Sequence, residues 1–143
     1  MELTLDQALQ KGIEAHKAGK VQEADRYYTA ILKANPKHPD ANHNMGVLAV
    51  GVGKVQEALP LFKTATEVNP NIAQFWISYI DAFIKLDRAD DAKEAFNQAI
   101  SKGITWSKLD KLEERLGWSG LKNVESSSTQ GPPQEQLQTI INL

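Results

Sequence analysis

The sequence contains no cysteine, and neither sign of charge is in clear excess. Without cysteine the chain has no disulfide, no thiolate metal ligand and no thiol nucleophile. Its 16 basic and 18 acidic residues leave a net charge of −2. A chain without an excess of positive charge binds phosphate backbones and anionic lipids poorly. We therefore expect neither nucleic acid nor a membrane among the partners.

Long hydrophobic runs are also missing, since no stretch approaches the length of a membrane span. The first residues, MELTLDQALQKG, contain Glu2 and Asp6 and no apolar run, so they do not resemble a signal peptide. These features indicate a cytoplasmic protein. A chain of 143 residues is long enough for one compact domain or a short repeat array.

The sequence does contain a repeat. The hexapeptide GKVQEA occurs at residues 19–24 and again at 53–58, which is 34 residues later. Other residues recur at this interval, with a weaker third copy: Gly12 and Gly46; Tyr28, Phe62 and Phe96; Ala24, Ala58 and Ala92; Asn35 and Asn69; Pro36 and Pro70. A fixed period of this size is typical of a stacked array of small units.

Each unit is predicted to form two helices. Thr4 and Gln7 form a capping box before the first helix, Gly19 ends that helix, and Pro36 ends the second one. Equivalent signals further along the chain predict helices over about 5–18, 21–34, 40–52, 55–68, 72–86 and 89–102. GKVQEA is then the turn within a helix pair plus the start of its second helix.

Small residues would allow the paired helices to approach closely, and an aromatic residue one turn further on would fill the remaining space. This pattern resembles the tetratricopeptide repeat, a helix-turn-helix unit of 34 residues. The second copy fits best: Met45, Gly46, Ala49, Ala58, Phe62, Ala65 and Pro70. The third copy contains Trp76, Tyr79, Phe83, Ala92, Phe96 and Ala99. Ile31, Ile80 and Ile104 depart from the family pattern.

The resemblance implies an all-α fold in which helix-turn-helix repeats stack as a right-handed α-solenoid. The repeats would cover about 5–38, 39–72 and 73–104. A further amphipathic helix at 105–116 would cap the array, which then spans 1–116.

The helical periodicity ends after residue 116. Residues 117–131 contain an SSST run and are typical of a flexible linker. Residues 132–143 start a further helix with Leu137, Ile140 and Ile141 on one face. We expect this helix to be truncated within a longer protein, and its apolar face to offer a route to a homodimer.

In the family that this chain resembles, the first helices of the pairs line a concave groove that binds the ligand. Here those helices carry an apolar stripe besides their core face, as a binding surface would. The predicted groove residues are Leu9, Ile13, His16, His43, Asn44, Val47, Val50, Ile77, Asp81 and Ile84. Such a groove favours a helical or extended peptide with aliphatic anchors. The alternative is that neighbouring helices or the C-terminal tail cover the stripe.

One subgroup of this family binds the acidic C-termini of heat-shock chaperones through a carboxylate clamp of lysine, arginine and asparagine. The corresponding positions here are Leu9, Ile13, Asn44, Gln74 and Ser78. Only the asparagine is kept, so the resemblance argues against chaperone-tail binding.

Nothing in the sequence indicates an enzyme or a cofactor. The glycines lie at helix ends and packing positions, and Ser78 near His43 would form a nucleophile pair only by coincidence. His16 and His43 lie on adjacent first helices, but a metal site needs a further ligand and Asp81 is one repeat away. We therefore expect no catalytic site and no metal.

The sequence thus predicts a scaffold that binds a protein or peptide. The alternative is a structural spacer or self-association module of a larger bacterial protein. Resemblance suggests proteins in which such repeats precede a glycosyltransferase or sulfotransferase domain, although no residue here carries such chemistry.

Overall fold

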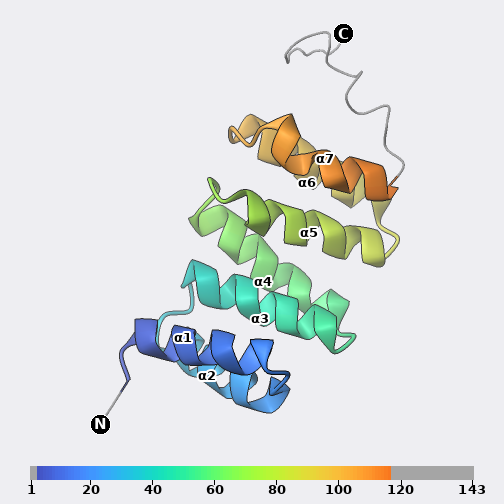
Figure 1. Ribbon diagram of the computed structural model, residues 1–143. Coiled ribbons are helices and arrows are strands. Elements are labelled where there is room, and N and C mark those ends of the chain that lie inside the picture. Colours follow the sequence, from blue (N-terminus) through green and yellow to red (C-terminus); the bar gives the residue numbers. More distant parts are fainter. Residues whose placement is uncertain (1–2, 117–143) are drawn as a thin grey trace, which may run out of the picture. The chain divides into compact units, whose positions relative to one another are not determined.

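The computed structural model describes residues 3–116, in which the only regular secondary structure is α-helix. Residues Met1–Ile104 form one compact unit, and Thr105–Leu143 belong to a second. Figure 1 shows the helices in chain order: α1 (Leu5–Lys17), α2 (Val21–Ala34), α3 (Pro39–Gly51), α4 (Val55–Val68), α5 (Ala73–Lys85), α6 (Ala89–Ser101) and α7 (Trp106–Leu116).

The first unit consists of three helix pairs, each with a first helix (α1, α3 or α5) and a second helix (α2, α4 or α6). Each second helix of the first two pairs also packs against the next first helix, α2 against α3 and α4 against α5. The expected all-α solenoid of helix-turn-helix repeats is therefore confirmed, and each helix expected within 5–102 forms with bounds within one residue of those predicted.

The C-terminal predictions fall partly on described residues. Helix α7 forms where a capping helix was expected, with Leu109 and Leu112 buried. Its capping role stays a prediction. The expected linker at 117–131 and the further helix at 132–143 lie outside the described residues. None of the described helices is long and apolar enough to cross a membrane.

The N-cap positions of the first helices are spaced by the same 34-residue period as the sequence repeat. Thr4 Oγ1 accepts a hydrogen bond from the Gln7 N–H at 3.0 Å, and Gln7 Oε1 accepts from the Thr4 N–H at 2.9 Å. At the equivalent position, His38 Nδ1 accepts from the Ala41 N–H at 3.1 Å. The third equivalent, Ile72, offers no side-chain cap. The first two starts thus satisfy N–H groups that a helix leaves unpaired.

The turn within each pair requires a residue with positive φ. Gly19 has φ of 78° and Gly53 has φ of 84°, which explains why glycine opens both GKVQEA copies. In the third repeat the same position is held by Asp87 with φ of 59°. The left-handed conformation costs free energy in any residue that has a Cβ atom. Asp87 is therefore a strained position in an otherwise regular turn.

We predict that Asp87→Gly raises the free energy of unfolding by about 0.5–1 kcal/mol, because glycine adopts this φ without the clash of a Cβ atom. Chemical denaturation of the two proteins measures the difference. The reverse change at the matched turn, Gly53→Asp, should destabilise by a similar amount. Equal stability of Asp87→Gly and the parent protein would contradict the strain.

Close contact between the paired helices depends on glycine facing an aromatic ring. A Cβ atom added at Gly12 would lie 2.6 Å from Tyr28 Cε1, and one added at Gly46 would lie 2.4 Å from Phe62 Cε1. Both rings are almost completely buried. In the third pair, Ile80 occupies the glycine position, and α5 and α6 pack against each other less extensively than the helices of the other pairs.

The loop between repeats accepts a hydrogen bond from a side chain of the following first helix. Different residues supply this bond at equivalent positions of the two repeats. Asn42 Nδ2 donates a hydrogen bond to the Pro36 carbonyl at 3.0 Å. One period later, Trp76 Nε1 donates to the Pro70 carbonyl at 2.9 Å. Both donors are buried. The same hydrogen bond, from the first helix to the proline carbonyl before it, therefore recurs in both repeats. Its donor is an amide in one repeat and an indole in the other.

Candidate functional site

The first helices α1, α3 and α5 lie next to one another, since α3 contacts both of the others. The ten predicted groove residues lie on these three helices. His43 is buried, and the others are half-buried: Leu9, Ile13, His16, Asn44, Val47, Val50, Ile77, Asp81 and Ile84. The stripe is therefore partly accessible, but it is not a row of freely exposed side chains.

Leu9 belongs partly to the core. It packs against one buried cluster that contains Ala8 and Ile31, and against another that contains Tyr28 and Leu48. Because these clusters join α1 and α2 to α3, Leu9 contributes to packing between the first two repeats. Its remaining accessible surface is what it could offer to a ligand.

His16 is held by the core of the first repeat. Its Nδ1 lies 3.3 Å from the hydroxyl oxygen of Tyr28, and the two rings meet edge to face with centroids 6.1 Å apart. Burial raises the pKa of the Tyr28 hydroxyl, so that hydroxyl stays neutral at physiological pH. His16 thus satisfies a buried hydroxyl and also marks one polar end of the stripe.

His43 joins α3 to α5 through a chain of polar side chains. Its Nε2 lies 2.8 Å from Ser78 Oγ, and its Nδ1 lies 3.3 Å from Asn44 Oδ1. Gln74 Nε2 donates to Ser78 Oγ at 3.3 Å. These contacts are all satisfied if the Ser78 hydroxyl donates to Nε2 and the Nδ1–H donates to Asn44. That arrangement requires a neutral imidazole.

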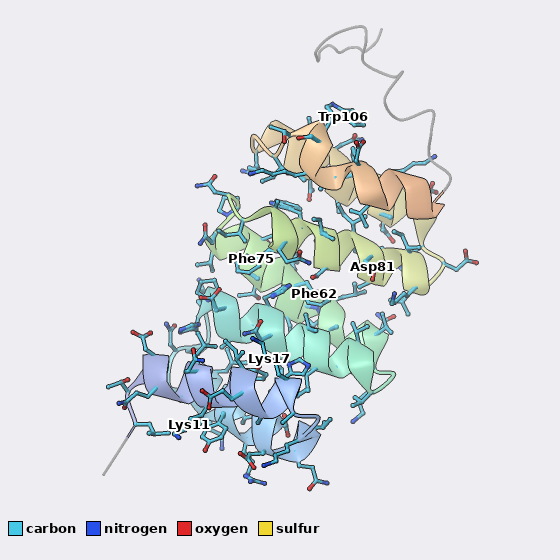
Figure 2. The ribbon with its side chains drawn as sticks, in the orientation of Figure 1. Lys11, Lys17, Phe62, Phe75, Asp81 and Trp106 are labelled. Atoms are coloured by element: carbon cyan, nitrogen blue, oxygen red, sulfur yellow. The ribbon has the colours of Figure 1, made fainter. Side chains whose placement is uncertain are left out.

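The surroundings of His43 are aromatic. Its ring centroid lies 4.9 Å from that of Phe75 and 5.6 Å from that of Phe62. Figure 2 shows both phenylalanines near the junction of α3, α4 and α5. Burial lowers the pKa of His43 from its ordinary value of 6.5, against smaller opposing effects of Asn44 and Asp40. A buried neutral histidine is therefore part of the contact between the second and third repeats.

The Ser78–His43 pair has the distance of a nucleophile and its base, but it lacks the rest of a catalytic site. Ser78 lies inside α5, where the backbone N–H groups are already hydrogen-bonded within the helix. No backbone donor near it in this helix is free to stabilise an oxyanion. The pair is best explained as a hydrogen bond between neighbouring repeats.

We predict that the free energy of unfolding falls as pH decreases below about 6.5, because the unfolded chain then binds a proton that folded His43 resists. The loss should level off once pH is below the lowered pKa of the folded state. Denaturation of the parent protein and of His43→Gln between pH 5 and 8 measures it. If the two proteins show the same pH dependence, His43 is not its source.

Asp81 and Lys85 form the polar part of the stripe on α5. Asp81 Oδ2 lies 2.9 Å from Lys85 Nζ, in an ion pair between successive turns of the helix. Within residues 3–116, no group of three or more histidine, cysteine or acidic side chains could hold a metal ion. His16, His43 and Asp81 are each engaged with different partners.

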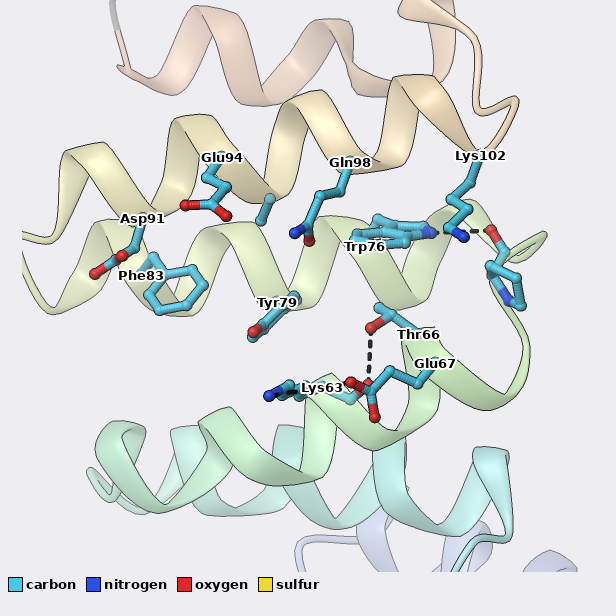
Figure 3. Close-up of a pocket in the computed structure, with 12 residues that line it drawn as sticks. Lys63, Thr66, Glu67, Trp76, Tyr79, Phe83, Asp91, Glu94, Gln98 and Lys102 are labelled. Atoms are coloured by element: carbon cyan, nitrogen blue, oxygen red, sulfur yellow. Dashed lines mark hydrogen bonds and ion pairs between the residues drawn. The ribbon is translucent and has the colours of Figure 1, made fainter.

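A second hollow lies where the sequence predicted only packing. It opens between the second helices α4 and α6, with α5 as its floor, and has a volume of about 500 Å³. Figure 3 shows Trp76, Tyr79 and Phe83 in a row along α5. The complete lining consists of Lys63, Thr66, Glu67, Pro70, Trp76, Tyr79, Phe83, Asp91, Glu94, Ala95, Gln98 and Lys102.

The sequence does hold a signal for this hollow. Ala95 stands where the equivalent residues are Leu61 and Tyr27, so a large side chain is missing at that position of α6. Ile80, which replaces glycine, also coincides with less extensive packing between α5 and α6. These departures of the third repeat coincide with a larger hollow than the one at the equivalent place of the first repeat.

Known proteins share both sequence and fold with this chain. Residues 43–105 match the family model of the tetratricopeptide repeat. Hsp70-Hsp90 organizing protein 1 of Glycine max is 26% identical over 95 residues, which make up 66% of this chain and 17% of that protein.

Solved structures with the same fold include MamA from Desulfovibrio magneticus, with a TM-score of 0.66 and 19% identity over 84% of this chain and 66% of that one. An O-GlcNAc transferase of Thermobaculum terrenum gives a TM-score of 0.63 at 19% identity, over 72% of this chain and 21% of that one. The chain also spans only 54% of another MamA structure and 17% of the curated relative.

The structural likenesses show the fold, and the family match identifies the repeat. Tetratricopeptide repeats form scaffolds that generally bind proteins or peptides. The 34-residue period, the glycine–aromatic contacts within the helix pairs and the match over 43–105 agree. Residues 43–105 of this chain therefore match the tetratricopeptide repeat, and residues 3–104 have the helix-pair fold of such repeats.

Proposed function

We propose that this chain binds a helical or extended peptide segment of another protein along α1, α3 and α5. The observation that carries the proposal is a stripe of half-buried aliphatic side chains on three adjacent helices. Its members are Leu9, Ile13, Val47, Val50, Ile77 and Ile84. Such a stripe suits a ligand that buries a few aliphatic anchors and leaves its polar side in water.

Polar groups at fixed positions would orient the ligand. His16 lies at one part of the stripe, where Tyr28 holds its ring, and the Asp81–Lys85 ion pair lies at another. Between them the buried ring of His43 fixes Asn44. Side chains that are already held lose little freedom on binding, so they add specificity at a small entropic cost.

The test begins with peptides selected from a display library against the parent chain. We predict that Ile13→Glu combined with Val47→Glu weakens the selected peptides at least about tenfold, because two carboxylates would enter an apolar contact. Isothermal titration calorimetry measures the affinity, and circular dichroism confirms that the variant folds.

The matched control is Gln22→Glu combined with Gln56→Glu. These glutamines are exposed at equivalent positions of the second helices, and the pair adds the same total charge. The control should bind as the parent does. If the groove variant also keeps full affinity, the ligand does not use this face. If the groove variant unfolds, the stripe is core.

The likeness to the Hsp70-Hsp90 organizing protein raises the question of chaperone tails. At the positions that correspond to the carboxylate clamp, Leu9 and Ile13 carry no charge. Gln74 and Ser78 are already hydrogen-bonded to each other. Asn44 Oδ1 lies against the ring of His43. We propose that the groove therefore recognises aliphatic side chains rather than a terminal carboxylate.

We predict that an acidic peptide with a free C-terminal carboxylate, added at up to about 1 mM, shows no saturable binding by calorimetry. A clamp without basic residues cannot offset the desolvation of several carboxylates. The amidated form of the same peptide is the control. Binding that depends on the free carboxylate would contradict the proposal.

The spacer role is the second candidate, supported by the array of similar fold within the larger O-GlcNAc transferase. A spacer needs the helix pairs to stack but does not need an accessible stripe. Library selection separates the two roles, since a spacer would yield no peptide whose affinity depends on Ile13 and Val47.

A further inference from the structure

The hollow between α4 and α6 has an aromatic floor that is closely spaced. The ring centroids of Tyr79 and Phe83 are 4.8 Å apart, and those of Tyr79 and Trp76 are 6.5 Å apart. Trp76 and Phe83 are buried, whereas Tyr79 is half-buried and offers the most accessible ring. The faces of such rings carry negative electrostatic potential and attract cations.

One end of this aromatic row already binds a guanidinium. The guanidinium carbon of Arg88 lies 5.0 Å from the centroid of Phe83. Arg88 Nε donates to Asp91 Oδ2 at 2.8 Å, so the same cation meets both a ring and a carboxylate. Arg88 is therefore an example, within this molecule, of a guanidinium bound by an aromatic ring of the row and an adjacent carboxylate.

The acidic side chains of the lining surround the middle of the row. Figure 3 shows Asp91 and Glu94 above Phe83 and Tyr79, with Glu67 on the opposite wall. Burial raises the pKa of the Tyr79 hydroxyl, and Glu67, Asp91 and Glu94 raise it further against the opposing effect of Arg88. Three acidic side chains and one guanidinium therefore act on Tyr79.

The lining also holds two lysines, Lys63 and Lys102, at different places in the hollow. Lys63 lies 4.0 Å from Glu67 in a pair whose side chains are both more than half exposed, so the pair is weak. Figure 3 shows Lys102 beyond Trp76, at the end of the hollow away from Phe83. Lys102 thus lies on the far side of Trp76 from Asp91 and Glu94, whereas Lys63 lies beside Glu67.

We propose that this hollow is a second binding site, which takes an arginine side chain from a peptide segment of a partner protein. The guanidinium would stack on Tyr79 and pair with Glu94, as Arg88 stacks on Phe83 and pairs with Asp91. The site lies between α4 and α6 and shares α5 with the proposed groove, but none of its lining residues belongs to that groove.

The probe is the acetylated and amidated peptide Ala-Leu-Arg-Leu-Ala, titrated into the ¹⁵N-labelled chain of residues 1–143 and followed by NMR. We expect saturable shifts at the indole N–H of Trp76 and at the amides of Tyr79, Glu94 and Gln98. The same peptide with citrulline in place of arginine is the matched control, because it has the same shape without the charge. It should cause no such shifts.

Three variants locate the contact. Tyr79→Leu removes the ring and should weaken the arginine peptide about two- to fivefold, the range expected for an exposed cation–π contact. Glu94→Gln removes an exposed charge with little risk to folding and should weaken it about twofold. Ala95→Leu restores the residue of the second repeat, fills the hollow and should abolish the shifts.

Two further variants keep the site distinct from the proposed groove. Met45→Leu alters the residue equivalent to Tyr79 in the second repeat, and Val47→Glu alters the groove. Both should bind the arginine peptide as the parent does. Equal binding of the citrulline peptide, full affinity in Glu94→Gln and Ala95→Leu, or shifts confined to α1 and α3 would overturn the proposal.

Discussion

The close approach of two helices at a glycine is the constraint on which the array depends. At Gly12 and Gly46 the facing aromatic ring lies where a Cβ atom would otherwise be. The buried rings of Tyr28 and Phe62 then contribute apolar burial on the order of 2 kcal/mol each. Because the ring can enter only if the side chain opposite is absent, one small residue determines the spacing of each of these pairs.

The third repeat lacks that constraint. Ile80 replaces the glycine, α5 and α6 pack against each other less extensively, and the small Ala95 stands where Leu61 stands in the second repeat. The hollow above Trp76, Tyr79 and Phe83 lies in this repeat. The equivalent hollow of the first repeat, beside Lys11, Ala15 and Tyr27, is smaller, with a volume of about 170 Å³.

The fold was predictable because its signals are local. Gly19, Gly53 and Pro36 end helices by backbone geometry alone, and the 34-residue period assigns each residue a place in its unit. Asp87 could also have been found, because it stands one full period after Gly53. The helix bounds needed no knowledge of distant contacts.

The candidate sites were less predictable, because they depend on which residues meet across repeats. The periodicity assigned His43 to an open groove, but the bond to Ser78 and the rings of Phe62 and Phe75 bury it. It placed Tyr79 in the repeat pattern without indicating that this ring is half-buried and lines a hollow. Exposure depends on the size of neighbouring side chains, which a helical period does not encode.

The central claim is that ligands bind along the first helices. Hydrogen–deuterium exchange of the chain, free and saturated with a peptide selected against it, tests this most directly. We expect the peptide to slow exchange in α1, α3 and α5 and to leave the outer faces of α2 and α4 unchanged. Slower exchange confined to the second helices, with α1 and α3 unaffected, would contradict the claim.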